Sequence, residues 1–381
     1  KGDTTYFSNM ADWNPAEMIG TKPKPLAMSL YSELITDSIW SVQRKNYKYK
    51  DVSPNVLMVN LAGSPYIDLR TDFNSFLPNG LNSSLEKKII NNYLKDLKYK
   101  TYLHDKIEFE LIPTCYDLNM SSINQLEKKI IEINKYKISE IQKIFFLIDD
   151  CKKFGTLPFS GIARIAFICT KILRSLIDKN FLDEKFVEKF YSSIPTITKK
   201  MNNDYSKVLK SKTFKRKFLK NYGHLRPLTY SISSKNYKEG FTQYFSNTNI
   251  EILPIKKQNP KLSKSLNNKI SKLFKKEKLE INFKEFLKLS QRSIEYREYS
   301  KFFFSKSINS IFENLIKFTE KLDINREDLE YISIKKILDC YSVLETEKLA
   351  VTLKREIRNN KKSYEILRQI KFPDFITSAN D

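Results

Sequence analysis

The spacing of apolar residues predicts helices along most of the chain. From about residue 122, apolar positions recur every three or four residues over 122–152, 159–179, 183–220, 261–275, 283–321, 326–341 and 345–370. Residues 160–176 are apolar almost all round, which is typical of a helix buried at the centre of a domain. Residues 231–262 have no clear period, and we expect a long surface excursion there, suited to mobility or to contact with a partner.

Two further helices are predicted near the N-terminus. Asn14 can cap the first of them, Pro15 suits its first position, and Glu17 can reach back as in a capping box. The second is predicted to run from Pro25 to about Arg44, because apolar residues again recur at helical spacing.

Three stretches between the predicted helices indicate strands instead. Residues 56–61 form an apolar run, 66–70 return after the turn at 63–65, and 107–115 alternate apolar and polar positions. The predicted fold class is therefore mainly α, a large helical domain with a small embedded antiparallel β element near residues 55–115. No repeat or long linker divides the chain, so we expect one domain over 1–381, with a mixed α/β subregion at 1–120 and a helical subregion at 121–381.

The composition excludes several classes of protein. Hydrophobic residues make up 41% and aromatic residues 13% of the chain, too many for a disordered protein. No apolar run is long enough to span a bilayer, so we predict no membrane partner. The four cysteines are widely spaced and His104 and His224 are the only histidines, which argues against a metal site or a disulfide framework and favours a reducing cytoplasm. The chain opens Lys-Gly-Asp without Met or a signal peptide, and we interpret it as part of a longer polypeptide.

The net charge of +23 comes from 67 basic and 44 acidic residues and has two interpretations. A basic surface attracts nucleic acid, anionic membranes or anionic small molecules. However, only 12 of the basic residues are Arg, and Lys, Asn, Ile, Phe and Tyr all have AT-rich codons, so genome composition alone explains many lysines. Nucleic-acid readers favour the planar fork of Arg, so we do not predict a nucleic-acid partner, although a basic helical nucleic-acid-binding protein stays the alternative.

The segment Tyr222-Gly-His-Leu-Arg-Pro227 places two candidate site residues on one loop. Gly223 suits the left-handed position that ends a helix, and Pro227 prevents the helix from continuing. His224 is then placed for proton transfer or phosphate contact, and Arg226 for anion binding. The structural alternative is that His224 closes the helix end through the last carbonyl groups.

An apolar stripe within residues 283–321 predicts that two cations are buried. The stripe consists of Phe304, Ile308, Ile311 and Leu315. Extended toward the N-terminus, the same helix face reaches Lys301 and Arg297. Burying an unpaired charge is costly, so these cations need carboxylate partners or a polar cavity. They line an anion site, or they pair with a carboxylate such as Glu298 or Glu295 in a structural network.

Polar residues also follow the predicted hairpin. Arg70 ends it, and Asp72 and Asn74 come directly after, so the three can hold the carboxylate, ammonium and amide groups of a zwitterion. An ordinary turn stabilised by Asp or Asn is the alternative. Glu108 lies on the polar face of the third predicted strand, where it pairs with the Arg groups or faces water. The chain has no phosphate-binding glycine loop and no nucleophile elbow, so we expect it to bind no nucleotide by itself.

Several blocks together resemble one known family. They are residues 12–20 (DWNPAEMIG), 23–26 (PKPL), 34–40 (LITDSIW), 65–70 (PYIDLR), 73–76 (FNSF), 103–110 (LHDKIEFE), 222–227 (YGHLRP) and 297–302 (REYSKF). The combination resembles the central domain of phosphoenolpyruvate-synthase-like phosphotransferases, and within that group most of all the ATP-dependent L-glutamine kinases of capsular phosphoramidate biosynthesis.

The resemblance implies a larger enzyme with three parts. An ATP-grasp domain would bind ATP and Mg²⁺, a swivelling domain would carry a phosphohistidine, and the domain between them would bind the acceptor. The β-phosphoryl of ATP would pass through the phosphohistidine to the amide nitrogen of L-glutamine, giving L-glutamine phosphate, AMP and phosphate. This chain has neither of the outer domains, and His104 and His224 lack the small-residue context of a swivelling histidine, so we expect no cofactor and no activity in the fragment alone.

The site residues inferred from the sequence fit such a transfer as a hypothesis. Arg70, Arg226, Arg297 and Lys301 would supply positive charge, Asp72, Asn74 and Glu108 would orient the substrate, and His224 would accept the proton. The same architecture with another acceptor, such as pyruvate or a hydroxyl compound, is the alternative within this family.

Overall fold

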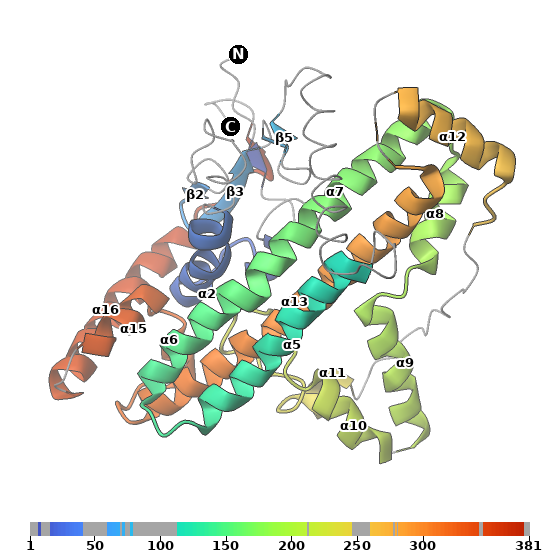
Figure 1. Cartoon of the computed structure of the whole chain (residues 1–381). Coiled ribbons are helices and arrows are strands. Elements are labelled where there is room, and N and C mark those ends of the chain that lie inside the picture. The colour runs from blue at the N-terminus through green and yellow to red at the C-terminus, as the bar shows by residue number, and fades with distance from the viewer. Residues whose placement is uncertain are drawn as a thin grey trace.

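One long helix, α13 (Phe283–Glu320), forms the axis of the computed structural model (Figure 1). The structure describes residues 7–8, 16–40, 59–68, 71–72, 77–78, 113–211, 213–245, 260–276, 279, 281–342 and 346–376. Three helices pack along α13, namely α5 (Pro113–Lys135), α6 (Glu140–Cys151) and α7 (Leu157–Asp178). This arrangement confirms the prediction of a mainly α fold.

Shorter helices surround this bundle. At one end lie α8 (Glu184–Ser193) and α12 (Lys264–Lys276), and beside the middle of α13 lie α9 (Ile197–Lys210), α10 (Thr213–Tyr222) and α11 (Phe241–Phe245). The remaining helices are α1 (Ala16–Ile19), α2 (Pro25–Tyr31) with a wider π-helical continuation (Ser32–Trp40), α14 (Arg326–Leu329), α15 (Ile334–Asp339) and α16 (Thr346–Leu367). None of the helices in the described ranges is long and apolar enough to cross a bilayer.

Local capping signals explain where the predicted helices divide. The predicted helix over 122–152 is two helices, because Ser139 forms a capping box with Gln142 and starts α6 anew. The predicted helix over 183–220 is three helices. Pro195 interrupts the chain before α9, where the side chain of Thr196 accepts a hydrogen bond from the backbone N–H of Lys199, and Ser211, whose backbone is extended, ends α9 before α10 begins. The predicted cap at Asn14 and Pro15 lies outside the described residues.

The β element is small and antiparallel, as predicted. Strands β2 (Val59–Leu61) and β3 (Ser64–Asp68) form a hairpin whose two turn residues, Ala62 and Gly63, have positive φ angles of 43° and 79°. The sheet continues through β1 (Phe7–Ser8) to β6 (Phe375–Ile376), and β4 (Thr71–Asp72) pairs separately with β5 (Leu77–Pro78). Strands from both ends of the chain therefore meet beside the hairpin, which the sequence pattern did not indicate.

The prediction of a third strand over 107–115 is wrong for its last three residues, 113–115, which are helical. Residues 107–112 lie outside the described residues, whereas α5 begins at Pro113. Proline suits the first position of a helix, because that position needs no backbone N–H donor.

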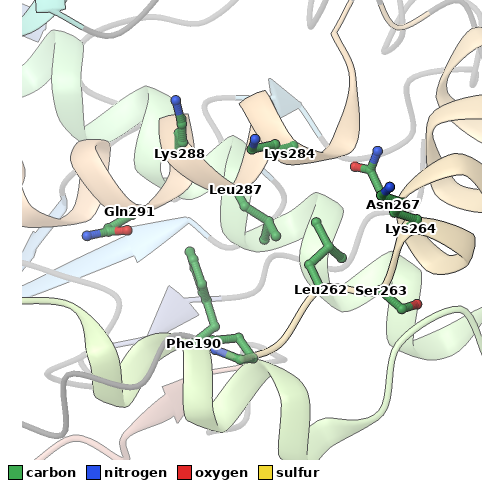
Figure 2. Close-up of a pocket in the computed structure, with 10 residues that line it drawn as sticks. Phe190, Leu262, Ser263, Lys264, Asn267, Lys284, Leu287, Lys288 and Gln291 are labelled. Atoms are coloured by element: carbon green, nitrogen blue, oxygen red, sulfur yellow. The ribbon is translucent and has the colours of Figure 1, made fainter.

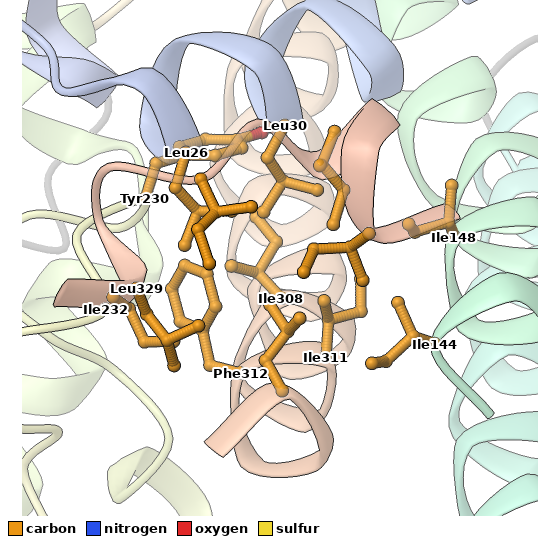
Figure 3. Close-up of a cluster of buried hydrophobic side chains, with 14 of the residues drawn as sticks. Leu26, Leu30, Ile144, Ile148, Tyr230, Ile232, Ile308, Ile311, Phe312 and Leu329 are labelled. Atoms are coloured by element: carbon orange, nitrogen blue, oxygen red, sulfur yellow. The ribbon is translucent and has the colours of Figure 1, made fainter. Parts of the chain in front are cut away.

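The core confirms the apolar stripe on α13. Phe304, Ile308, Ile311 and Leu315 are at most 1% exposed and belong to one buried cluster with residues of α2 and α6. Figure 3 shows Ile308 and Ile311 of this stripe in that cluster, together with Leu30 from α2 and Ile144 from α6. Tyr230 and Ile232 are buried in the same cluster, and the ring of Tyr230 meets that of Tyr31 edge to face at 5.5 Å. Within the predicted surface excursion over 231–262, Ile232 and Asn236 are buried, so the described part from 231 to 245 is anchored in the core and that part of the expectation is wrong, while residues 246–259 lie outside the described residues.

Candidate functional site

The loop that carries His224 starts from a tight turn at the end of α10. The backbone N–H of Gly223 donates to the carbonyl oxygen of Leu219 at 2.8 Å, and a Cβ atom on Gly223 would lie 2.3 Å from that oxygen. The described glycines with positive φ are Gly20 and Gly63, so the predicted left-handed conformation at Gly223 is wrong. Glycine is needed at position 223 because its Cα lies so close to the carbonyl group of Leu219 that no Cβ atom fits between them.

His224 is held against the middle of α13. Its Nε2 lies 3.2 Å from the carbonyl oxygen of Phe302, and its ring meets the Phe302 ring edge to face at 4.8 Å. Because a carbonyl oxygen only accepts, Nε2 carries the hydrogen and Nδ1 keeps its lone pair. The histidine thus bonds to a carbonyl group of α13. The structural alternative, in which His224 closes the end of its own helix through the last carbonyl groups, is therefore wrong.

Burial keeps this imidazole neutral. Desolvation, with the positive charges of Lys306 and Arg226, lowers the pKa of His224 to about 3. A neutral imidazole with one bonded N–H offers a fixed acceptor atom at ordinary pH.

The low pKa of His224 gives a direct prediction. We expect the ring to titrate near pH 3 in the folded protein, against 6.5 for an ordinary histidine. The unfolded chain then binds more protons between these values, so His224 contributes stability that is present above about pH 6.5 and is lost as the pH falls toward 3. Nuclear magnetic resonance of the ring, with His224→Gln for assignment, measures this, and a His224 titration midpoint near pH 6.5 would contradict the described burial.

Arg226 shapes the loop. Its guanidinium, 7% exposed as a residue, donates to the carbonyl oxygens of Ser231 and Ser234 at 3.3 and 3.2 Å and to Oδ1 of Asn309 at 2.6 Å. It also lies over the ring of Phe312 at 4.8 Å. Burial and the nearby Arg326 lower its pKa to about 10. Arg226 is therefore engaged with the protein itself and does not line the pocket beside it, so this arrangement does not favour its predicted role in anion binding.

An open pocket of about 760 Å³ lies beside His224. Its lining residues are Lys215, Arg216, Leu219 and Lys220 from α10, Gly223, His224, Asn236 and Lys238 from the loop, and Asn309 and Glu313 from α13. We call it the His224 pocket. Four cations thus share the space with one carboxylate, two amides and a neutral imidazole, which suits a small molecule that carries both negative and positive groups.

The amide side of the His224 pocket is rigidly connected. Asn236 is 3% exposed, and its Nδ2 donates to Oδ1 of Asn309 at 3.1 Å. The Nδ2 of Asn309 in turn donates to Oε1 of Glu313 at 2.9 Å. Oδ1 of Asn309 also accepts a hydrogen bond from Arg226. Hydrogen bonds therefore fix the orientation of Asn236, Asn309 and Glu313.

Arg297 and Lys301 do not lie on a buried face, so that prediction is wrong. The side chain of Arg297 is 32% exposed and pairs with Glu298 through Nε at 3.0 Å and Nη2 at 2.7 Å, which is the structural alternative. Lys301 is likewise partly buried. Residues 294–301 lie where α13 passes from one apolar cluster to the next, so the face that is covered elsewhere is partly open there. Neither cation lines the His224 pocket.

The other predicted site residues are not placed. Arg70, Asn74 and Glu108 lie outside the described residues, and Asp72 is described only as backbone, paired with Leu77 in β4. Their roles stay predictions.

The cations that do surround His224 were missed in the sequence. Lys215, Lys220 and Lys238 resemble the many solvated lysines of this chain, and nothing in their spacing set them apart. Arg216 was the available signal, because it is one of only 12 Arg residues and stands beside the His224 loop in the sequence. Asn309 lies outside the apolar stripe of α13, among other polar residues of the helix, so its position in the sequence did not mark it as a site residue.

No protein-family model matches this chain. A search of curated proteins found no match either.

Among the described residues, no three His, Cys, Asp or Glu side chains gather as a metal site.

Proposed function

We propose that this chain is the acceptor-binding domain of an ATP-dependent phosphotransferase, and that the His224 pocket holds an acceptor of the L-glutamine type. The observation that carries the proposal is the combination of a neutral imidazole, four cations and an oriented carboxylate in one pocket. The short blocks that resemble the L-glutamine kinases support the choice of acceptor.

The charges of the pocket match an α-amino acid. Lys215, Arg216 and Lys220 face the pocket from α10 and would hold the α-carboxylate and the incoming phosphoryl oxygens. Glu313, fixed by Asn309, would hold the α-ammonium. Pyruvate has no positive group for Glu313 to bind, so the pocket favours the amino acid over the keto acid.

His224 would accept the proton released in the transfer. The nitrogen of the glutamine side-chain amide attacks phosphorus, the N–P bond of the phosphohistidine breaks, and one amide proton passes to Nδ1 of His224. The pKa of about 3 is low for a base. Because positive neighbours and burial lower it, a phosphoryl anion in the pocket would raise it at the moment when the proton is released. The phosphohistidine and the ATP-grasp domain with its ATP and Mg²⁺ would lie outside this chain.

Removing the charge of Glu313 tests the assignment of the ammonium site. We expect Glu313→Gln to weaken L-glutamine binding about tenfold, since one charge-assisted contact is lost while the shape is kept. Calorimetry measures the affinity, and Glu320→Gln, an exposed carboxylate on the same helix, is the matched control. Equal binding by both variants, or tighter binding of pyruvate than of L-glutamine by the parent protein, would refute the proposal.

A further inference from the structure

A second pocket, of about 480 Å³, lies at the N-terminal end of α13 (Figure 2). It is bounded by α8, by the start of α12 and by the first turns of α13. Its lining residues are Phe190, Pro260, Leu262, Ser263, Lys264, Asn267, Lys284, Leu287, Lys288 and Gln291. None of them lines the His224 pocket, so the two sites are independent. We call this second site the α12 pocket.

The floor of the α12 pocket is apolar. Phe190 is 4% exposed and rises from α8, while Leu262 and Leu287 point toward the same space from the other two sides (Figure 2). All three belong to the cluster that contains Phe274 and Phe283, so packing behind them holds the floor in place. An apolar surface of this kind binds the hydrocarbon part of a ligand.

The rim of the α12 pocket is cationic. Lys264 comes from α12 and Lys284 and Lys288 come from α13, and no Asp or Glu is among the lining residues. Lys264 and Lys284 have exposed side chains, and neither forms an ion pair with any residue in the described parts of the chain. Like charges around a small opening repel one another, and an anion bound among them relieves that repulsion.

We propose that the α12 pocket binds an amphipathic organic carboxylate. The apolar body lies over Phe190, Leu262 and Leu287, and the carboxylate meets Lys264 and Lys284. Flexible ammonium groups suit a single anionic head, since they act as point charges and impose no planar fork. The volume lies within the range of small-molecule sites, so a medium-chain acyl or an aryl body fits.

Octanoate is the probe for this site, with butanoate and 1-octanol as comparisons. We expect calorimetry on the wild-type protein to show saturable octanoate binding at least tenfold tighter than that of butanoate, since each buried methylene contributes about fourfold in affinity. We also expect octanoate to bind about tenfold tighter than 1-octanol, which lacks the charge. Equal affinity for octanoate and 1-octanol, or for octanoate and butanoate, overturns the proposal.

Charge reversal separates this pocket from general attraction by a basic protein. The double variant Lys264→Glu/Lys284→Glu should lose at least tenfold in octanoate affinity. The control Lys272→Glu/Lys275→Glu changes the net charge equally at exposed positions of α12 outside the pocket and should keep the affinity within about twofold. Unchanged cooperative unfolding shows that both variants are folded. An equal loss in both, or a loss in neither, would mean that the lysines of the α12 pocket do not hold the carboxylate.

Discussion

In the full-length phosphotransferase that we propose, replacing His224 by Ala should abolish phosphoryl transfer to L-glutamine while the phosphohistidine still forms. The loss expected for a missing proton acceptor is about 10²- to 10⁴-fold in the transfer rate. His224 lines the acceptor pocket, whereas ATP would bind in another domain, so release of AMP in the first half-reaction should continue. Rapid-quench measurement of phosphoenzyme and of glutamine phosphate separates the two steps.

His224→Gln distinguishes proton transfer from structural support. A glutamine amide can still donate to the carbonyl oxygen of Phe302, which restores the contact that Nε2 makes at 3.2 Å. We expect this variant to be stable and to bind L-glutamine, yet to transfer the phosphoryl group as slowly as the Ala variant. Recovery of transfer by His224→Gln would show that the residue only positions the loop.

Phe304→Ala should destabilise the domain by about 3–5 kcal/mol, the largest single loss of stability that we expect. Phe304 is fully buried, and its ring meets that of Phe159 edge to face at 5.3 Å. The backbone of Gly155 also packs against it, since a Cβ atom added to Gly155 would lie 2.9 Å from the Cβ atom of Phe304. Removing the buried ring leaves a cavity in a closely packed core and breaks its contact with Phe159. Chemical denaturation measures the loss as a lower midpoint with an unchanged slope.

Phe145→Ala is the matched control for this core substitution. Phe145 is 45% exposed on α6, so removing its ring should cost well under about 1 kcal/mol. Similar losses for Phe145→Ala and Phe304→Ala would mean that α13 does not pack as described.

Local patterns predicted the elements that depend on neighbours in the sequence. The stripe from Phe304 to Leu315 identified the core face of α13, and the turn predicted at 63–65 identified the hairpin, although Ser64 and Pro65 already pair in β3 and the turn residues are Ala62 and Gly63. Contacts between distant segments could not be predicted in this way. Tyr230 is buried because Tyr31 meets it, and Arg226 is engaged because the carbonyls of its own loop turn back onto it.

The same division between local patterns and distant contacts explains why only part of the candidate site was predicted. His224 could be singled out because histidine is rare in this chain, and its loop could be placed at a helix end. Its environment depends on Phe302 and Lys306, which belong to a helix about eighty residues later. Arg297 shows the converse, since helical spacing alone assigned it to a buried face that the neighbouring helices leave partly open.

The most direct test of the central claim is the resonance of the His224 ring in the complete enzyme during titration with L-glutamine. This chain contributes only His104 and His224 to the spectrum, and the signal lost in His224→Ala is that of His224. Binding in the His224 pocket predicts a saturable shift of the signal that His224→Ala removes. A catalytically active enzyme that saturates with L-glutamine while the His224 signal stays unchanged would contradict the assignment of the acceptor site.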